Sequence, residues 1–139
     1  MLWQLVVTTR SEAETRQLAG EVGRQWAPGD VVLLEGPLGA GKTTFVRGFL
    51  ESLGYVGPVR SPTFNLAQTF ATDPPVVHLD LYRLDSPSGL DFFELIEGRI
   101  ALVEWPDRLE GWIDLESCWR VTVSLNGDDR IFEFAQPDL

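Results

Sequence analysis

One eight-residue stretch constrains this chain more than any other. Residues 36–43 read Gly-Pro-Leu-Gly-Ala-Gly-Lys-Thr and match the phosphate-binding loop pattern G-x-x-x-x-G-K-[ST] at every fixed position. An apolar run lies directly before it within residues 30–35, and apolar residues recur at helical spacing over residues 44–50 directly after it. The pattern therefore predicts a buried strand, a glycine-rich loop and a helix in succession. The alternative is a chance match in an ordinary glycine-rich turn.

Each part of this loop has a chemical reason. Glycines let the backbone curl until successive N–H groups point at a phosphate, and the N-terminus of the following helix adds a favourable dipole. Lys42 is expected to reach the outer phosphates of a nucleotide, and Thr43 is expected to hold magnesium. The residues of this stretch that we expect to contact the nucleotide are Gly36, Leu38, Gly39, Ala40, Gly41, Lys42, Thr43 and Thr44.

Length and composition favour one folded domain over residues 1–139, because 44% of the residues are hydrophobic and 139 residues suit a single core. The longest apolar runs fall far short of the roughly 20 residues that span a bilayer. The N-terminus also lacks a basic segment followed by an apolar one. We therefore expect a soluble cytoplasmic protein with no membrane association. The single cysteine, Cys118, cannot form an internal disulfide and is expected to fill a strand face.

The charge of the chain bears on its partners. Eleven basic and 21 acidic residues give a net charge of −10, which argues against a broad surface that binds nucleic-acid phosphates. If a nucleic acid is involved, another protein is expected to hold it. A local positive pocket around Lys42, Arg47, Arg60 and Arg83 stays open at this point.

The order of the expected elements indicates an α/β fold. Residues 2–8 are typical of a strand, and Ser11 and Glu14 form a capping box that starts a helix. Alternating residues 118–125 and 130–134 around a turn predict a β-hairpin. The expected fold is a single P-loop NTPase-type domain, with a mostly parallel sheet flanked by helices and an antiparallel C-terminal hairpin.

Two polar segments have more than one interpretation. The turn of residues 8–11 could approach a base or ribose, although helix capping alone explains Ser11. In residues 59–64, Pro62 holds Ser61 extended and places two hydroxyls on a stiff segment. This segment is either a nucleotide switch that senses a γ-phosphate or a plain turn into a strand over residues 65–70.

Two carboxylates are predicted at strand ends beside the loop. Glu104 follows the apolar residues 100–103, and Asp80 lies near the end of an apolar run over residues 76–82. Glu104 is the better candidate for the acid beside the magnesium, and Asp80 is the other candidate. One of the two would orient a metal-bound water, and the other would orient the attacking water. Either acid could instead simply cap a strand end. His78, in the same run as Asp80, is interpreted as a satisfied core residue rather than a ligand.

Four blocks together resemble the bacterial TsaE (YjeE) family of small ATPases, which are required for threonylcarbamoyladenosine synthesis on tRNA. The matching blocks are residues 36–48, 61–64, 80–84 and 104–106, and the resemblance covers nearly the whole chain. Phe70 stands where many relatives have tyrosine, and the C-terminal hairpin matches the family only in pattern.

The resemblance implies roles for individual residues. Lys42 and Thr43 would bind ATP and Mg²⁺, with Glu104 as a second magnesium ligand, and Asp80 and Thr63 would support hydrolysis. It also raises Thr9 and Ser11 as nucleotide contacts. Trp105 and the pair Tyr82-Arg83 would belong to the rim of the site or to a surface that faces a partner. The implied catalytic residues are thus Lys42, Thr63, Asp80 and Glu104.

The resemblance further implies a function and partners. The protein would be an ATP-hydrolysing switch, weak alone, which acts on a TsaB–TsaD type complex and meets tRNA only through those partners. The main alternative is a small-molecule P-loop kinase, for which the chain has little length to form an acceptor pocket and an arginine-bearing lid. A GTPase is disfavoured because no N/T-K-x-D motif occurs. A nucleotide-binding scaffold without hydrolysis is the third possibility.

Overall fold

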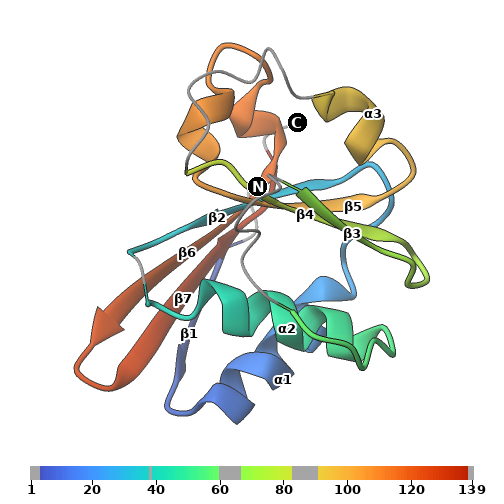
Figure 1. Cartoon of the computed structure of the whole chain (residues 1–139). Helices are drawn as coiled ribbons and strands as arrows, with labels where there is room; N and C mark the ends of the chain where they lie inside the picture. The colour runs from blue at the N-terminus through green and yellow to red at the C-terminus, as the bar shows by residue number, and fades with distance from the viewer. Residues whose placement is uncertain (1–3, 38, 60–66, 83–90, 138–139) are drawn as a thin grey trace.

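A mixed seven-stranded sheet runs through the molecule (Figure 1), in the strand order β1-β7-β6-β2-β5-β4-β3. The computed structural model describes residues 4–37, 39–59, 67–82 and 91–137. The strands are β1 Gln4–Thr9, β2 Val31–Glu35, β3 Ala67–Phe70, β4 Val76–Asp80, β5 Ile100–Glu104, β6 Trp119–Asn126 and β7 Asp129–Ala135. The helices are α1 Glu12–Gly23, α2 Lys42–Ser52 and α3 Phe92–Ile96, with short 3₁₀ turns η2 Pro106–Leu109 and η3 Leu115–Ser117.

The centre of the sheet is parallel and its two sides are antiparallel. Strand β2 pairs in parallel with β5 and β6, and β5 pairs in parallel with β4. The pairs β1–β7, β6–β7 and β3–β4 are antiparallel. The predicted α/β fold with an antiparallel C-terminal hairpin is confirmed, although "mostly parallel" describes only the central four strands. Strands β2 and β5 are nearly continuous apolar runs because they are covered on both faces.

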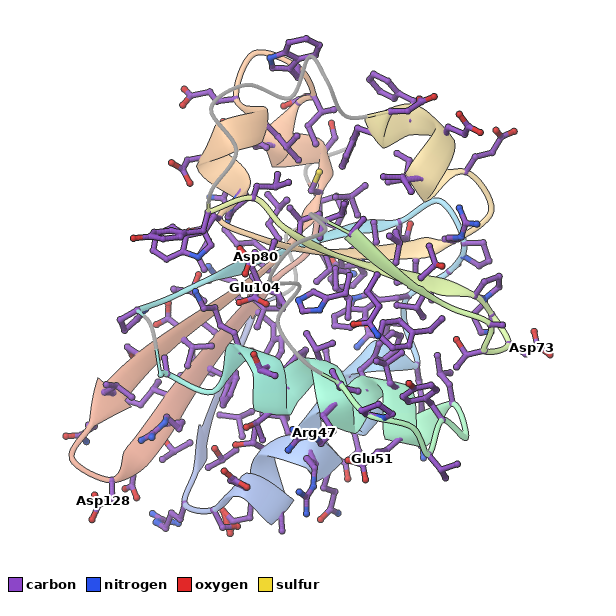
Figure 2. The ribbon with its side chains drawn as sticks, viewed as in Figure 1. Arg47, Glu51, Asp73, Asp80, Glu104 and Asp128 are labelled. Carbon is purple, nitrogen blue, oxygen red and sulfur yellow. The ribbon has the colours of Figure 1, made fainter. Side chains whose placement is uncertain are left out.

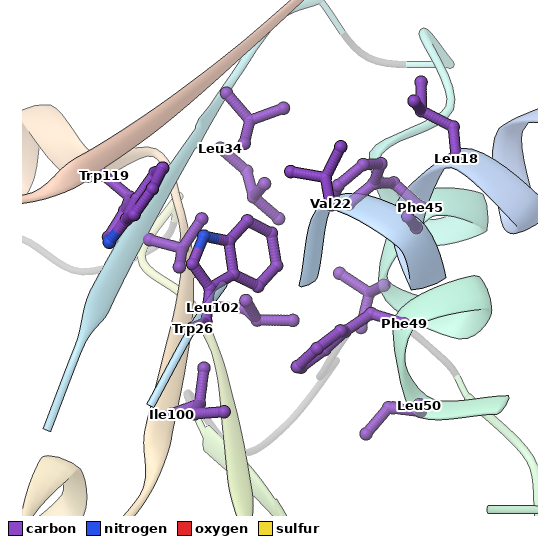
Figure 3. Packing of buried hydrophobic residues seen from close by; sticks show 14 of the residues in the cluster. Leu18, Val22, Trp26, Leu34, Phe45, Phe49, Leu50, Ile100, Leu102 and Trp119 are labelled. Carbon is purple, nitrogen blue, oxygen red and sulfur yellow. The ribbon is translucent and has the colours of Figure 1, made fainter. Parts of the chain in front are cut away.

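Helices cover the two faces unequally (Figure 1). Helices α1 and α2 lie against one face, where Trp26 packs edge-on against Phe49 with ring centroids 5.1 Å apart (Figure 3). The other face is covered by α3 and the 3₁₀ turns, and its buried residues include Phe92 and Leu109. Burying both faces leaves the strand ends as the place where polar side chains can gather.

The predicted capping box forms in part. Ser11 is the N-cap of α1, and its hydroxyl accepts a hydrogen bond from the Glu14 N–H at 3.1 Å. The Glu14 carboxylate accepts from the N–H of Arg10 at 2.8 Å, so the return bond closes on the residue before the cap. The helix still begins where the sequence places it.

The predicted C-terminal hairpin is confirmed with a tighter turn than its sequence spacing indicates. Asn126 pairs with Asp129 at its end, which leaves only Gly127 and Asp128 between the strands. Gly127 has a φ of +62°, a conformation that favours glycine.

Cys118 lies immediately before β6 and so does not fill a strand face as expected, but its side chain is buried in the same cluster as Phe92 and Leu109. Burial, followed by the nearby Asp114 charge, raises the pKa of its thiol to about 11. The thiol is therefore protonated at neutral pH and is a poor nucleophile.

Close contact between α1 and α2 depends on Gly48. A Cβ at this position would overlap the backbone of Arg16, which neither helix can relieve by a rotamer change. We expect Gly48→Ala to lower the free energy of unfolding by about 2 kcal/mol, despite the roughly 1 kcal/mol of helix propensity that alanine adds. Chemical denaturation measures this loss.

The matched control is Gly20→Ala on the facing helix. Its Cβ would lie 3.0 Å from the Cβ of Ser52, a tight contact but without the overlap with backbone atoms that a Cβ at Gly48 would have. We expect a smaller loss there. A Gly48→Ala protein as stable as the wild type would contradict this account of the helix contact.

Candidate functional site

Four segments meet at a cavity of about 230 Å³ at the carboxyl ends of β4 and β5. The segments are the glycine-rich loop, the start of α2 and the ends of these two strands. Asp80 and Glu104 lie side by side there (Figure 2) and are register partners across β4 and β5. The lining residues are Gly39, Gly41, Lys42, Thr43, Thr44, Asp80, Glu104 and Trp105. Residues predicted from three separate sequence blocks thus share one cavity.

The loop backbone takes the shape that a phosphate cradle needs. Gly36 has no room for a side chain, because a Cβ would lie 2.7 Å from the carbonyl oxygen of Val123. Gly41 is the N-cap of α2 in a left-handed conformation, with φ +105°. The first i→i−4 bond of the helix runs from Phe45 N to Gly41 O at 2.9 Å. The N–H groups of the first turn therefore lie at the positive end of the helix dipole, beside the cavity.

Lys42 is buried at the centre of the site. Its Nζ donates to the Gly36 carbonyl at 2.8 Å and lies 3.9 Å from Oε1 of Glu104. The same ammonium lies 4.6 Å from the ring centroid of Trp105. Only 5% of Lys42 and 4% of Glu104 is exposed, so the two charges compensate each other inside the protein. Lys42 is thereby held at the wall of the cavity.

Glu104 has a second partner on the neighbouring strand. Its Oε2 lies 2.6 Å from Nε2 of His78, whose side chain is completely buried. His78 is thus a core histidine, as predicted, but it contacts the expected magnesium ligand, which the sequence interpretation missed. The available signal was the two-residue period of a strand, since residues 78 and 80 share a face of β4.

Asp80 and Trp105 form the outer part of the site. Asp80 is partly exposed, and its carboxylate accepts from the Tyr82 N–H at 3.1 Å. Trp105 has φ +59°, the only positive φ of a non-glycine residue in the described ranges, and it turns the chain directly after β5. Its ring contacts Tyr82 with centroids 4.8 Å apart. The aromatic pair lies at the rim, where the sequence resemblance put it.

The other predicted site residues lie as follows. Thr9 is buried, with its hydroxyl 2.7 Å from that of Thr15, and Ser11 caps α1, so both hydroxyls already take part in local structure. Neither lines the cavity. Ala40 is fully buried in the core beneath the loop. Leu38 and Thr63 lie outside the described residues, as do Arg60 and Arg83 of the suggested positive pocket.

Arg130 is a cation near the loop that the sequence interpretation did not include. It lies near the start of β7, opposite Thr9 of β1, and its Nε lies 4.0 Å from where a Cβ of Gly41 would stand. Its Nη1 donates to the carbonyl of Asp128 at 3.1 Å. No sequence signal could have found it, because the contact depends on how the hairpin packs in the sheet.

The oxygen donors fit magnesium. The hydroxyl-bearing Thr43 and the carboxylates of Glu104 and Asp80 line the same cavity. Among the described residues, no three His, Cys, Asp or Glu side chains form a preformed cluster for a metal. Magnesium is typically held by one or two carboxylates together with phosphate oxygens and water, so a complete protein cage is not needed.

Comparisons with known proteins agree with this geometry. A family model described as "Threonylcarbamoyl adenosine biosynthesis protein TsaE" matches residues 9–132. A Bacillus subtilis protein named tRNA threonylcarbamoyladenosine biosynthesis protein TsaE is 38% identical over 91% of this chain and 81% of its own length. Proteins of that name from Aquifex aeolicus and Rickettsia conorii are 41% and 44% identical, over 73% and 72% of this chain. This chain spans 77% of the Aquifex protein and 60% of the Rickettsia one.

A solved structure is similar throughout. The crystal structure of Bacillus subtilis YdiB superposes with a TM-score of 0.84 at 32% sequence identity, covering 99% of this chain and 88% of that one. No helix within the described part of the chain is long and apolar enough to cross a membrane.

Proposed function

Since this chain belongs to the TsaE family, whose proteins are named for tRNA threonylcarbamoyladenosine biosynthesis, we propose that it is a magnesium-dependent ATPase. We further propose that it works as a switch on a TsaB–TsaD type complex. The observation that carries this proposal is the single cavity where the loop glycines, Lys42 and two carboxylates converge. Such an arrangement suits phosphoryl transfer to water, which needs positioning and charge stabilisation but no covalent intermediate.

Each residue has a defined part in the proposed reaction. The loop N–H groups and Lys42 bind the phosphates, which requires Lys42 to exchange its contacts with Gly36 and Glu104 for phosphate oxygens. Thr43 and Glu104 hold magnesium, which neutralises charge on the outer phosphates when bound. Asp80, at the partly exposed side of the cavity, orients the attacking water.

A partner is proposed to complete the site. Arg47 donates to the carbonyl of Val59 at 3.5 Å and does not line the cavity, so it is not placed to stabilise the transferring phosphoryl group. We therefore propose slow hydrolysis by the protein alone and stimulation by the complex. The net charge of −10 supports indirect contact with tRNA, through the partners.

The direct test measures ATP hydrolysis with and without purified TsaB and TsaD, together with ATP-dependent association. We expect association in the presence of ATP and a faster release of phosphate. Equal rates combined with no ATP-dependent association would reject the switch.

One observation favours the kinase alternative. A second cavity of about 380 Å³ adjoins Lys42 on the other side of Trp105, lined in part by Glu35, Asp107 and Glu110. It is large enough to admit a small acceptor. Mass spectrometry after incubation with ATP and a panel of nucleosides and metabolites distinguishes the two functions. The switch yields only ADP and phosphate, whereas a kinase yields a phosphorylated acceptor.

Arg130 offers a test of the nucleotide-binding site. Because its guanidinium lies beside Gly41, we propose that it contributes a charge-assisted contact to the bound nucleotide. We expect Arg130→Ala to weaken ATP binding about tenfold, the effect of losing roughly 1.5 kcal/mol. Isothermal titration calorimetry measures the change.

Arg16→Ala is the matched control, since Arg16 pairs with Glu51 at 3.5 Å on the α1–α2 side and does not line the cavity. It removes the same charge and should leave the affinity unchanged. If the two variants bind ATP equally well, the assignment of Arg130 fails.

A further inference from the structure

We propose that His78 is a positioning residue for Glu104. The imidazole of His78 donates a hydrogen bond to one carboxylate oxygen of Glu104 and holds that carboxylate in place. The other oxygen, which lies near Lys42, would bind magnesium once Lys42 has moved away. This inference rests on the proposed function, because it takes Glu104 as a magnesium ligand.

The two oxygens of Glu104 already have separate contacts. Oε2 lies 2.6 Å from His78 Nε2, and Oε1 lies 3.9 Å from Lys42 Nζ. His78 and Glu104 project from adjacent parallel strands in the centre of the sheet, and their exposed fractions are 0% and 4%. A short hydrogen bond between two buried side chains on rigid strands restricts the rotation of the carboxylate.

The hydrogen-bond partners of His78 indicate which nitrogen of its ring is the donor. Nδ1 of His78 is buried and has no partner among the described residues. An ionised carboxylate only accepts hydrogen bonds, so the His78–Glu104 hydrogen bond has Nε2–H as its donor.

This hydrogen bond matters when Lys42 moves to the phosphates. Glu104 then loses its nearby cation, and without a second partner its carboxylate would be free to rotate and follow the ammonium of Lys42. His78 keeps Oε2 engaged, so that Oε1 stays directed at the cavity shared with Thr43. Some residues fix the orientation of a metal ligand without binding the metal themselves. Removing such a residue typically lowers metal affinity or activity about 10–100-fold.

The first test needs no nucleotide. His78 is the only histidine in the chain, so ¹⁵N-histidine labelling yields a single ring system in NMR spectra. We expect a protonated Nε2, with a slowly exchanging Nε2–H that is lost in Glu104→Ala. An Nε2 without a proton, or an Nε2–H that persists unchanged in Glu104→Ala, would overturn the inference.

The second test measures ATP affinity with Mg²⁺ and with EDTA in two matched variants. His78→Gln places an amide donor near the former Nε2, whereas the shorter Asn of His78→Asn falls short of Glu104. The measured quantity is the increase in ATP affinity that Mg²⁺ causes relative to EDTA. We expect this increase to be about tenfold smaller in His78→Asn than in the wild type, and to remain within about threefold of the wild-type value in His78→Gln. Affinity in EDTA should be unchanged in both.

Val76→Ala controls for general loosening of β4, because Val76 is fully buried on the same strand. It should preserve the magnesium-dependent gain. Equal losses in His78→Asn and Val76→Ala, or no difference between the Asn and Gln variants, would reject the positioning role. A wild type that binds no ATP would instead reject the proposed function, while the NMR result still decides the His78–Glu104 hydrogen bond.

Discussion

Lys42→Met is expected to lower kcat for ATP hydrolysis at least a hundredfold. Lys42 is the buried cation that links the loop to Glu104, and methionine keeps most of its volume while removing the charge. Losing one preorganised donor to a developing negative charge costs about 10²–10³-fold in rate, and a buried cation at the transferred phosphate should fall in that range. Steady-state phosphate release measures the effect.

Two controls separate this chemical effect from unfolding. Arg47→Ala removes a cation from the same helix that does not line the cavity, and it should leave the rate within about twofold. Thermal denaturation of Lys42→Met measures the loss of stability when Glu104 loses Lys42 but keeps its hydrogen bond with His78. Hydrolysis at the wild-type rate in Lys42→Met would refute the phosphate-binding role.

Glu104→Gln is expected to remove the magnesium dependence of hydrolysis and to lower its rate by about a hundredfold, because a neutral amide is a poor magnesium ligand. The substitution keeps the shape of the side chain, and its amide oxygen can still accept from His78 Nε2–H. The variant should therefore fold and bind ATP but fail to turn it over. With the TsaB–TsaD type partners, we expect an ATP-bound complex that does not reset.

The matched control is Glu51→Gln. Glu51 pairs with Arg16 at 3.5 Å on the α1–α2 side and lines neither of the two cavities that adjoin Lys42. Phosphate release and association are followed together for both variants across a magnesium titration. Normal hydrolysis by Glu104→Gln would show that the metal is held elsewhere.

Much of the site could be predicted because each of its parts depends on a short stretch of the sequence. The loop of residues 36–43 requires its glycines within a few positions of one another, and Gly41 indeed begins α2 in a left-handed conformation. Asp80 and Glu104 were placed correctly because each follows a buried run, and parallel strands end at the same edge of the sheet. The chemical roles of all the predicted site residues stay predictions, because the structure gives their positions alone.

The remaining contacts depend on residues far apart in the chain. The hydrogen bond from His78 to Glu104 follows from the pairing of β4 with β5, and the approach of Arg130 to Gly41 follows from the packing of the hairpin beside β1 and β2. The two-residue period of β4 puts His78 on the same face as Asp80, but it does not give the neighbouring strand, because strand order is decided by which apolar faces pack together. The sequence alone thus determined the glycine-rich loop and the strand-end acids, through local backbone and periodicity rules. Only the tertiary structure decided which side chains hold Lys42 and Glu104 in place, since those contacts form when the strands assemble into one sheet.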